Sequence, residues 1–128
     1  MSVTRSAGLL ALAAALTAPA VFAAGNADTG KTLFTSKGCV ACHGVAKDAP
    51  PSVGPNLVGV VGRKAGTTTG LMPTSEAMKK YGVTWNAKTL DEFLTNPSAK
   101  VPGTAMVGVL PDAGERADMI AYLASLKK

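Results

Sequence analysis

Apolar positions recur with helical spacing near the C-terminal end of the chain. Four apolar side chains share one face of a predicted helix: Met119, Ile120, Leu123 and Leu126. Side chains three and four positions apart lie together on a helix, so this repeat indicates a helix with one buried side. Asp112 and Glu115 precede it with the spacing of a capping box. The pattern therefore predicts a helix that begins near Asp112.

The sequence also predicts helices in three shorter segments, at residues 28–37, 75–81 and 86–95. Asn26 or Asp28 can cap the first of these, and Gly38 and Gly82 follow the first two. Pro97 follows the third, and both glycine and proline commonly end helices. No segment has the alternating pattern of a strand. We therefore expect an all-α fold with four or five helices.

Long irregular stretches rich in glycine and proline lie between these helices, at residues 44–70 and 96–112. Loops of this length are unusual in a small domain that has an ordinary core. Aromatic residues are also few, with three Phe, two Tyr and one Trp in the whole chain. A large apolar cofactor at the centre would supply the missing interior, because a domain of this size can bury only a modest core of its own.

The first 24 residues have the three parts of a secretory signal peptide. Arg5 gives the basic start, residues 7–18 are mostly Ala and Leu, and small residues surround the expected cleavage site after Ala23 or Ala24. We expect a mature domain at residues 25–128 that works in the periplasm. The apolar run is shorter than the roughly 20 residues that span a bilayer, which argues against an uncleaved anchor and against stable membrane insertion after cleavage.

The mature chain is mildly basic. The full chain has 13 basic and 8 acidic side chains, so removal of Arg5 leaves a net charge of about +4. The basic residues are scattered rather than concentrated, which argues against nucleic-acid binding. A mild positive charge suits an acidic patch on a protein partner. We expect a monomer that meets acidic surfaces on protein partners.

The segment Cys39-Val40-Ala41-Cys42-His43 is the attachment pattern for c-type haem. Cysteines three positions apart lie on one side of a helical turn, so both thiols can form thioethers with the two vinyl groups at one haem edge. The following histidine, the only one in the chain, comes beneath the iron as an axial ligand. We therefore expect one haem c that is bound through Cys39 and Cys42 and ligated by His43.

Three other interpretations of the two cysteines are weaker. A disulfide across this spacing would close a tight loop and stabilise little. A thioredoxin-like redox pair needs a preceding strand, which the pattern does not predict. A zinc site needs four ligands, and two cysteines with one histidine do not reach that number.

A second axial ligand must come from another segment, and a methionine in this position is typical of electron-transfer haems. The candidates in the mature chain are Met72, Met78, Met106 and Met119. Met119 belongs to the apolar helix face and is most simply a core residue. Met72 and Met78 flank a short helix, where methionine often fills gaps. Met106 lies in a loop, where no helical period explains an apolar side chain. This makes Met106 a slightly better candidate for the second axial ligand than the others.

Several further motifs follow in a fixed order: Gly54-Pro55-Asn56-Leu57, Gly62-Arg63-Lys64, Trp85, Thr89-Leu90, Asn96-Pro97, Pro102-Gly103-Thr104-Ala105-Met106 and Asp118-Met119-Ile120-Ala121-Tyr122-Leu123. With these motifs the chain resembles the small class I cytochromes c, of the mitochondrial and bacterial c2 or c-550 type, over nearly the whole mature region. The resemblance implies the small cytochrome c fold, in which four or five helices and long loops surround one haem. It also implies an electron-transfer protein and not an enzyme.

The resemblance further implies roles for single residues. Met106 would be the sixth ligand of the iron. The Pro55 carbonyl would accept the second ring proton of the axial histidine and thereby fix its tautomer. Arg63, the Trp85 indole N–H and the Thr104 hydroxyl would hold the haem propionates, because carboxylates are costly to bury without such partners.

The chain departs from the family pattern at several positions. Phe93 stands where relatives often have a tyrosine near the methionine sulfur, and Gly108 stands where they have an aromatic that shields the haem edge. A lysine-rich docking ring is usual where this chain has Ser98, Ala99 and Ala105. The resemblance therefore leaves the redox partners unidentified.

We expect the protein to carry single electrons between redox partners. The first alternative is a haem subunit that stays bound to a periplasmic dehydrogenase, since the fold would be the same. The second is a gas-binding or peroxidatic haem with an open iron position, which gains weight if Met106 does not ligate.

Overall fold

The computed structural model describes residues 14–15 and 24–128, so the predicted signal peptide lies outside the described residues apart from 14–15 and Ala24. In the described part the elements are α1 (Ala27–Ser36), the 3-10 turn η1 (Cys39–Ala41), α2 (Glu76–Tyr81), α3 (Ala87–Thr95), α4 (Pro97–Lys100) and α5 (Ala113–Ser125). That part contains no strand, only an isolated bridge between Lys64 and Thr84. The all-α prediction is confirmed. None of the described helices is both long and apolar enough to cross a bilayer.

Side-chain caps fix where the helices begin. Asn26 caps α1, and Asn86 caps α3, where Thr89 completes a capping box. Asp112 caps α5 by accepting a hydrogen bond from the backbone N–H of Glu115. The predicted box at α5 is only half formed, because the Glu115 carboxylate pairs with a lysine that follows α1. The helix starts are therefore set locally, within three or four residues of each cap.

The stretch at residues 96–112, which the sequence predicts to be irregular, contains the additional short helix α4. The Asn96 side chain accepts a hydrogen bond from the Ala99 N–H at 3.2 Å, and Pro97 occupies the first turn. Proline suits this position because its fixed φ is helical and its missing N–H has no helical partner there. Pro97 therefore ends the preceding helix, as predicted, and also begins the next one.

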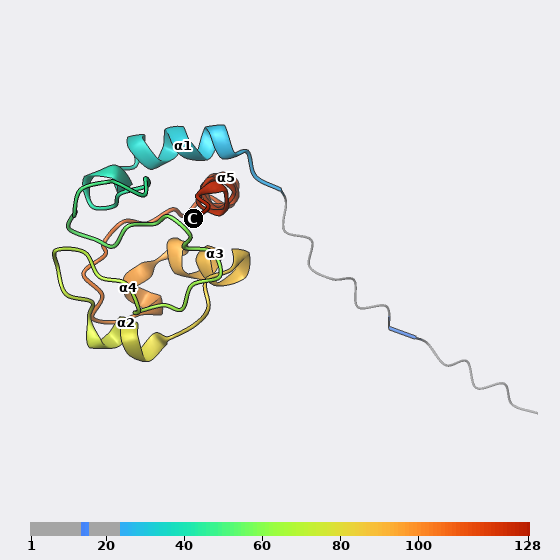
Figure 1. The fold of residues 1–128 in the computed structure, drawn as a ribbon. Coiled ribbons are helices and arrows are strands. Elements are labelled where there is room, and N and C mark those ends of the chain that lie inside the picture. The colour runs from blue at the N-terminus through green and yellow to red at the C-terminus, as the bar shows by residue number, and fades with distance from the viewer. Residues whose placement is uncertain (1–13, 16–23) are drawn as a thin grey trace, which may run out of the picture.

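The helices at the two ends of the described domain, α1 and α5, lie against each other (Figure 1). Gly30 permits this close approach, since a Cβ there would collide with the backbone carbonyl of Asp118. Phe34 and Tyr122 pack edge to face with their ring centroids 5.6 Å apart, an arrangement that aromatic pairs favour. Met119 is fully enclosed beside them. This contact fixes α1, and with it the segment that follows α1.

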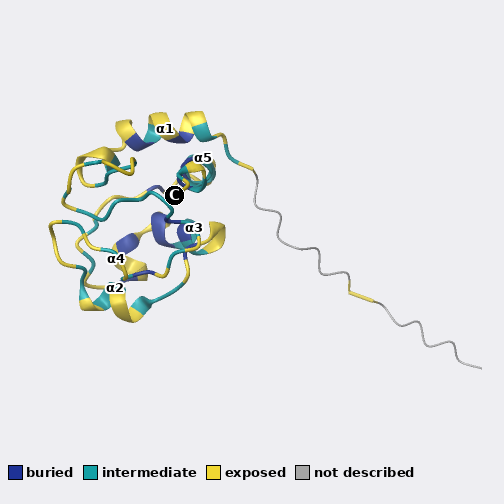
Figure 2. Cartoon of the chain, in the orientation of Figure 1, coloured by how far each residue is buried: buried dark blue, intermediate teal, exposed yellow. Residues whose placement is uncertain are grey.

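Helix α3 contributes further buried side chains and is largely dark blue in Figure 2. Leu90, Phe93 and Leu94 face the interior, and the Phe93 ring packs on Trp85 at 5.1 Å between centroids. The loop that contains Met106 returns to α3, where the Leu110 N–H donates to the Leu94 carbonyl at 2.8 Å. The core therefore joins α3 to segments that precede it and follow it in the sequence.

Candidate functional site

A single 3-10 turn positions both cysteines. It begins at Gly38, whose φ of 79° favours glycine. The N–H groups of Cys42 and His43 both donate to the Cys39 carbonyl, at 3.1 and 3.0 Å. Cys39 is half-buried, Cys42 is exposed, and neither is in a disulfide. Burial raises the pKa of the Cys39 thiol, with a smaller contribution from the nearby Cys42. Two thiols and an imidazole thus come from one turn of the chain.

The imidazole of His43 has a defined tautomer. Its Nδ1 lies 2.7 Å from the Pro55 carbonyl oxygen. A carbonyl can only accept, so Nδ1 carries the proton and Nε2 keeps its lone pair for a metal ion. A Cβ on Gly54 would lie 2.6 Å from Cε1 of the same ring, so a larger residue there would push the imidazole aside. The structure contains the His43–Pro55 contact that the resemblance implies.

Backbone and amide hydrogen bonds fasten this histidine segment to the Pro55 loop. The Gly54 N–H donates to the Cys42 carbonyl at 2.7 Å. The Asn56 amide donates to the Ala46 carbonyl at 2.7 Å and accepts from the Val58 N–H at 2.9 Å. Sequence reasoning gave Asn56 no role of its own, and its place in the Gly54–Leu57 motif was the only signal. The ring orientation therefore depends on a bonded loop and not on one contact.

Arg63 and Trp85, both predicted to hold propionates, lie together. The backbone N–H of Trp85 donates to the Arg63 carbonyl at 2.9 Å, and the Gly62 N–H donates to the Trp85 carbonyl at 2.7 Å. The half-buried guanidinium of Arg63 donates to the Asn56 and Val58 carbonyls at 3.0 and 3.4 Å. Burial lowers the pKa of Arg63. A guanidinium has five N–H groups, so donors remain for an anion.

The loop that contains Thr104 and Met106 forms the third part of the site. The Met106 N–H donates to the Thr104 hydroxyl oxygen at 3.3 Å, which leaves the hydroxyl proton for another acceptor. Met106 is half-buried and packs against the core, as does Met78 of α2. Met119 of α5 is almost fully enclosed, and Met72 is exposed. Met106 and Met78 are thus the two candidates that lie partly buried at the border of the core.

The three parts of the site border one apolar interior. Cys39 and Met106 pack against the same buried cluster that contains Trp85. Two thiols, an imidazole with an available Nε2, a thioether and donors for carboxylates form the set that a covalent haem requires. Among the described residues no three His, Cys, Asp or Glu side chains gather as a metal-binding group, so that part of the chain holds no zinc-type site. The donor set fits haem c.

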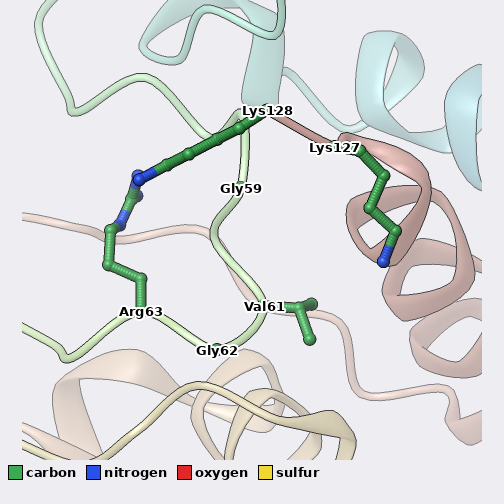
Figure 3. A pocket seen from close by; sticks show the side chains of 6 residues that line it. All are labelled: Gly59, Val61, Gly62, Arg63, Lys127 and Lys128. Carbon is green, nitrogen blue, oxygen red and sulfur yellow. The ribbon is translucent and has the colours of Figure 1, made fainter.

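A separate surface pocket of about 360 Å³ lies beside Arg63. Lys127 and Lys128 also line it, and Lys128 extends across Gly59 in the direction of Arg63 (Figure 3). Its lining includes neither cysteine, nor His43 or Met106. The pocket thus shares Arg63 with the predicted haem site, but it contains none of the predicted thioether or iron ligands.

Comparison with known proteins identifies the family of this chain. The cytochrome c family model matches residues 27–127. Cytochrome c2 of Rhodomicrobium vannielii is 46% identical over 114 residues, which cover 88% of this chain and 89% of the relative. Cytochrome c of Cannabis sativa is 45% identical over 100 residues, with 77% and 88% covered, and cytochrome c2 of Rhodoblastus acidophilus is 42% identical over 105 residues, with 81% and 95% covered. The chain belongs to the cytochrome c family and is a class I c-type cytochrome.

Proposed function

We propose that this cytochrome carries single electrons between protein partners through one haem c, attached at Cys39 and Cys42 and ligated by His43 and Met106. Cytochromes c are electron carriers and not enzymes, so no substrate chemistry is needed. The single observation that supports the site best is the His43 tautomer. The ring presents Nε2 as a ligand in the same turn that carries two unpaired thiols.

When bound, the haem supplies an iron that alternates between the ferric and ferrous states. The chain's own contribution is to hold the ligands and exclude water. The Pro55 carbonyl accepts the Nδ1 proton of His43, which orients the ring and strengthens Nε2 as a donor. The buried side chains of Trp85, Leu90 and Phe93 make the interior apolar, and an apolar interior disfavours added positive charge. These residues therefore favour the reduced state.

Electrons would enter and leave at the cysteine turn. Val40, between the two cysteines, is 52% exposed, so the outer side of this turn would be open to a partner. We assign the propionates to Arg63, Trp85 and Thr104, each of which keeps a polar N–H or O–H group for them.

We also propose that the protein works in the periplasm as a monomer. Residues 1–24 supply the export signal, with cleavage after Ala23 or Ala24, and residues 25–128 form the mature monohaem domain. The composition of the leader supports this location, and two of the relatives are bacterial cytochromes c2.

One observation favours the alternative of a haem subunit that remains bound to a dehydrogenase. Val107 and Val109, which follow Met106, are 84% and 50% exposed. Apolar side chains beside a haem edge suit a lasting interface better than a brief encounter. Co-purification of a catalytic subunit with the exported protein distinguishes the two proposals.

A spectrum of the purified protein, with a pyridine haemochrome assay and an intact mass, tests the cofactor and its number. Met106→Ala should abolish the red sulfur-to-iron charge-transfer band of the oxidised protein, because no second sulfur is held in its place. Met78→Ala is the matched control and should keep the band. If Met78→Ala loses the band and Met106→Ala retains it, the assignment of the sixth ligand is wrong.

A further inference from the structure

Arg116 connects three segments beyond the far end of the Met106 loop. Its Nε donates to Asp91 Oδ1 at 2.7 Å. Its Nη1 donates to the carbonyls of Leu110 and Pro111, at 2.9 and 2.7 Å. One guanidinium of α5 thus binds α3 and the backbone of residues 110–111.

This ion pair is the least exposed one among the described residues. The side chain of Arg116 is 12% exposed and that of Asp91 is 29% exposed, whereas both partners are more exposed in every other described pair. Exposed ion pairs contribute little because water screens them. Charge-assisted hydrogen bonds that are sheltered from water are stronger and more directional. Arg116 is therefore placed to hold residues 110–111 firmly.

The residues between Met106 and this anchor are held by little else. Val107 and Val109 are exposed, and a Cβ on Gly108 would meet nothing within 4 Å. No hydrogen bond among the described residues involves residues 107–109. The chain after Met106 is next fixed at Leu110, through the Leu94 carbonyl and the Arg116 side chain.

We propose that Arg116 and Asp91 form a clamp that positions Met106. The clamp does not touch the methionine and acts through residues 110–111. It reinforces the end of the loop at Leu110, which keeps the sulfur near the iron. The proposal rests on Met106 being the sixth ligand, as proposed above.

The physical reason is the entropy of loop closure. With residues 110–111 fixed, Met106 lies between two nearby anchors, the Thr104 hydroxyl and Leu110. Without the clamp only the bond from the Leu110 N–H to the Leu94 carbonyl and the burial of Leu110 hold this end of the loop, so the end opens more often. When it is open the tether is longer, which lowers the effective concentration of the sulfur at the iron. Loss of the charge-assisted hydrogen bonds also removes a favourable free energy that stabilises only the closed conformation of the loop. Both effects raise the fraction of molecules in which the methionine is released.

Displacement of the methionine by added imidazole measures that fraction. Imidazole binds the ferric protein only after the sulfur leaves, so its apparent affinity rises in proportion to the open population. Arg116→Gln and Asp91→Ala should each raise the apparent imidazole affinity by about 10-fold to 100-fold, the factor expected for a lost hydrogen bond to a charged group. The double variant should add little to either single change, because both remove the same clamp. Arg116→Lys should give an intermediate increase, since a lysine can pair with Asp91 but cannot bond both carbonyls as a planar fork.

Glu115→Gln is the matched control. Glu115 lies in the same turn of α5, but its carboxylate pairs with Lys37 on the α1 side, at 2.8 Å. The imidazole affinity of this variant should stay within about 2-fold of wild type, because this pair joins α5 to the end of α1 and makes no bond to residues 110–111. An equal rise in Glu115→Gln and Arg116→Gln would overturn the clamp, since it would show a general loosening of α5. Wild-type affinity in folded Arg116→Lys and Asp91→Ala proteins would also overturn it.

The charge-transfer band separates this result from a failure of the proposed function. If the oxidised wild type shows the band and Met106→Ala lacks it, the ligand assignment stands whatever the clamp variants do. If Met106→Ala keeps the band, the assignment of Met106 as the ligand is wrong, and the clamp proposal, which depends on it, is wrong too.

Discussion

The two sides of the candidate haem site are held in different ways. On the histidine side the Cys39–Ala41 turn, the Pro55 carbonyl and the close contact with Gly54 all act directly on His43 or on its neighbours. On the methionine side a single hydrogen bond to Thr104 reaches Met106, and the residues that follow are exposed. The imidazole is therefore fixed by groups in direct contact with it. The thioether is instead positioned by the anchors at the two ends of the loop that contains Met106.

This difference predicts an order of events when the protein is stressed. Segments with few buried contacts and few backbone hydrogen bonds open at a smaller free energy than the whole fold does. The 107–109 segment has both properties. The histidine segment also has no fully buried residue in its turn, but its backbone is hydrogen-bonded at Cys42, His43 and Gly54. The methionine should therefore leave the iron before the histidine does, whether heat, pH or a competing ligand is applied.

The largest expected effect comes from removing the covalent anchor on the histidine side. Cys39→Ser with Cys42→Ser should leave a protein with no attached haem and no cooperative thermal transition, because the described core is small without the cofactor. Intact mass and far-UV circular dichroism measure the two consequences. A haem-free double variant that is well folded would contradict this prediction, because the polypeptide would then not need the cofactor as part of its core.

Two glycine substitutions test directly whether the histidine side of the site is packed more tightly than the methionine side. In Gly54→Ala the new Cβ meets the His43 ring at 2.6 Å, so we expect a loss of about 1–3 kcal/mol in the free energy of unfolding, the usual cost of overpacking. Gly108→Ala adds the same group on the methionine side, where nothing lies within 4 Å. We expect it to change stability by about 0.5 kcal/mol or less, as for most surface substitutions.

Denaturant unfolding of the two variants, followed by Soret absorbance, measures this pair. A shift of the ferric spectrum should accompany the stability loss in Gly54→Ala, since the displaced atom belongs to a ligand ring. Equal stability losses at the two positions would show that both sides of the site are packed alike.

The sequence allowed prediction of the features that depend on near neighbours. The α5 helix follows from its apolar repeat and from Asp112, and the geometry of Cys39, Cys42 and His43 follows from their spacing in one turn. The clamp could not be predicted, because Asp91 and Arg116 are 25 positions apart and each looks like an ordinary surface charge in its own helix. Local sequence patterns carry no information about contacts between distant segments of the chain.

Two further residues illustrate the same limit. Pro97 was expected only to end a helix, and it also begins α4, because Asn96 supplies the cap that restarts the chain. Gly54 stands in a motif that the sequence shows, but the reason for glycine there is the His43 ring from another segment. In both cases the residue type marked the position as special. The structural reason became clear only from the contacts in the folded chain.

The smallest expected effect concerns the near end of the Met106 loop, where Lys100 of α4 pairs with Glu92 of α3 at 2.8 Å. The hydrogen bond from Lys100 and its charge lower the pKa of Glu92. A carboxyl whose pKa is lowered by folding stabilises the protein above its unfolded pKa, near 4.5, and that contribution is lost as the pH falls through the lower folded pKa. Glu92→Gln should therefore lower the melting temperature slightly at pH 7 and not at all in strong acid.

Both groups of this pair are exposed, so salt should screen the effect. Thermal melts at pH 7 and pH 3, each at low and high ionic strength, measure it. Glu92→Gln should also leave the imidazole affinity near the wild-type value, in contrast to Arg116→Gln at the far end of the same loop. If the exposed pair proved as important to methionine retention as the sheltered one, burial of the far-end anchor would not explain how the thioether is held, and the two ends of the loop would have to be treated as equivalent.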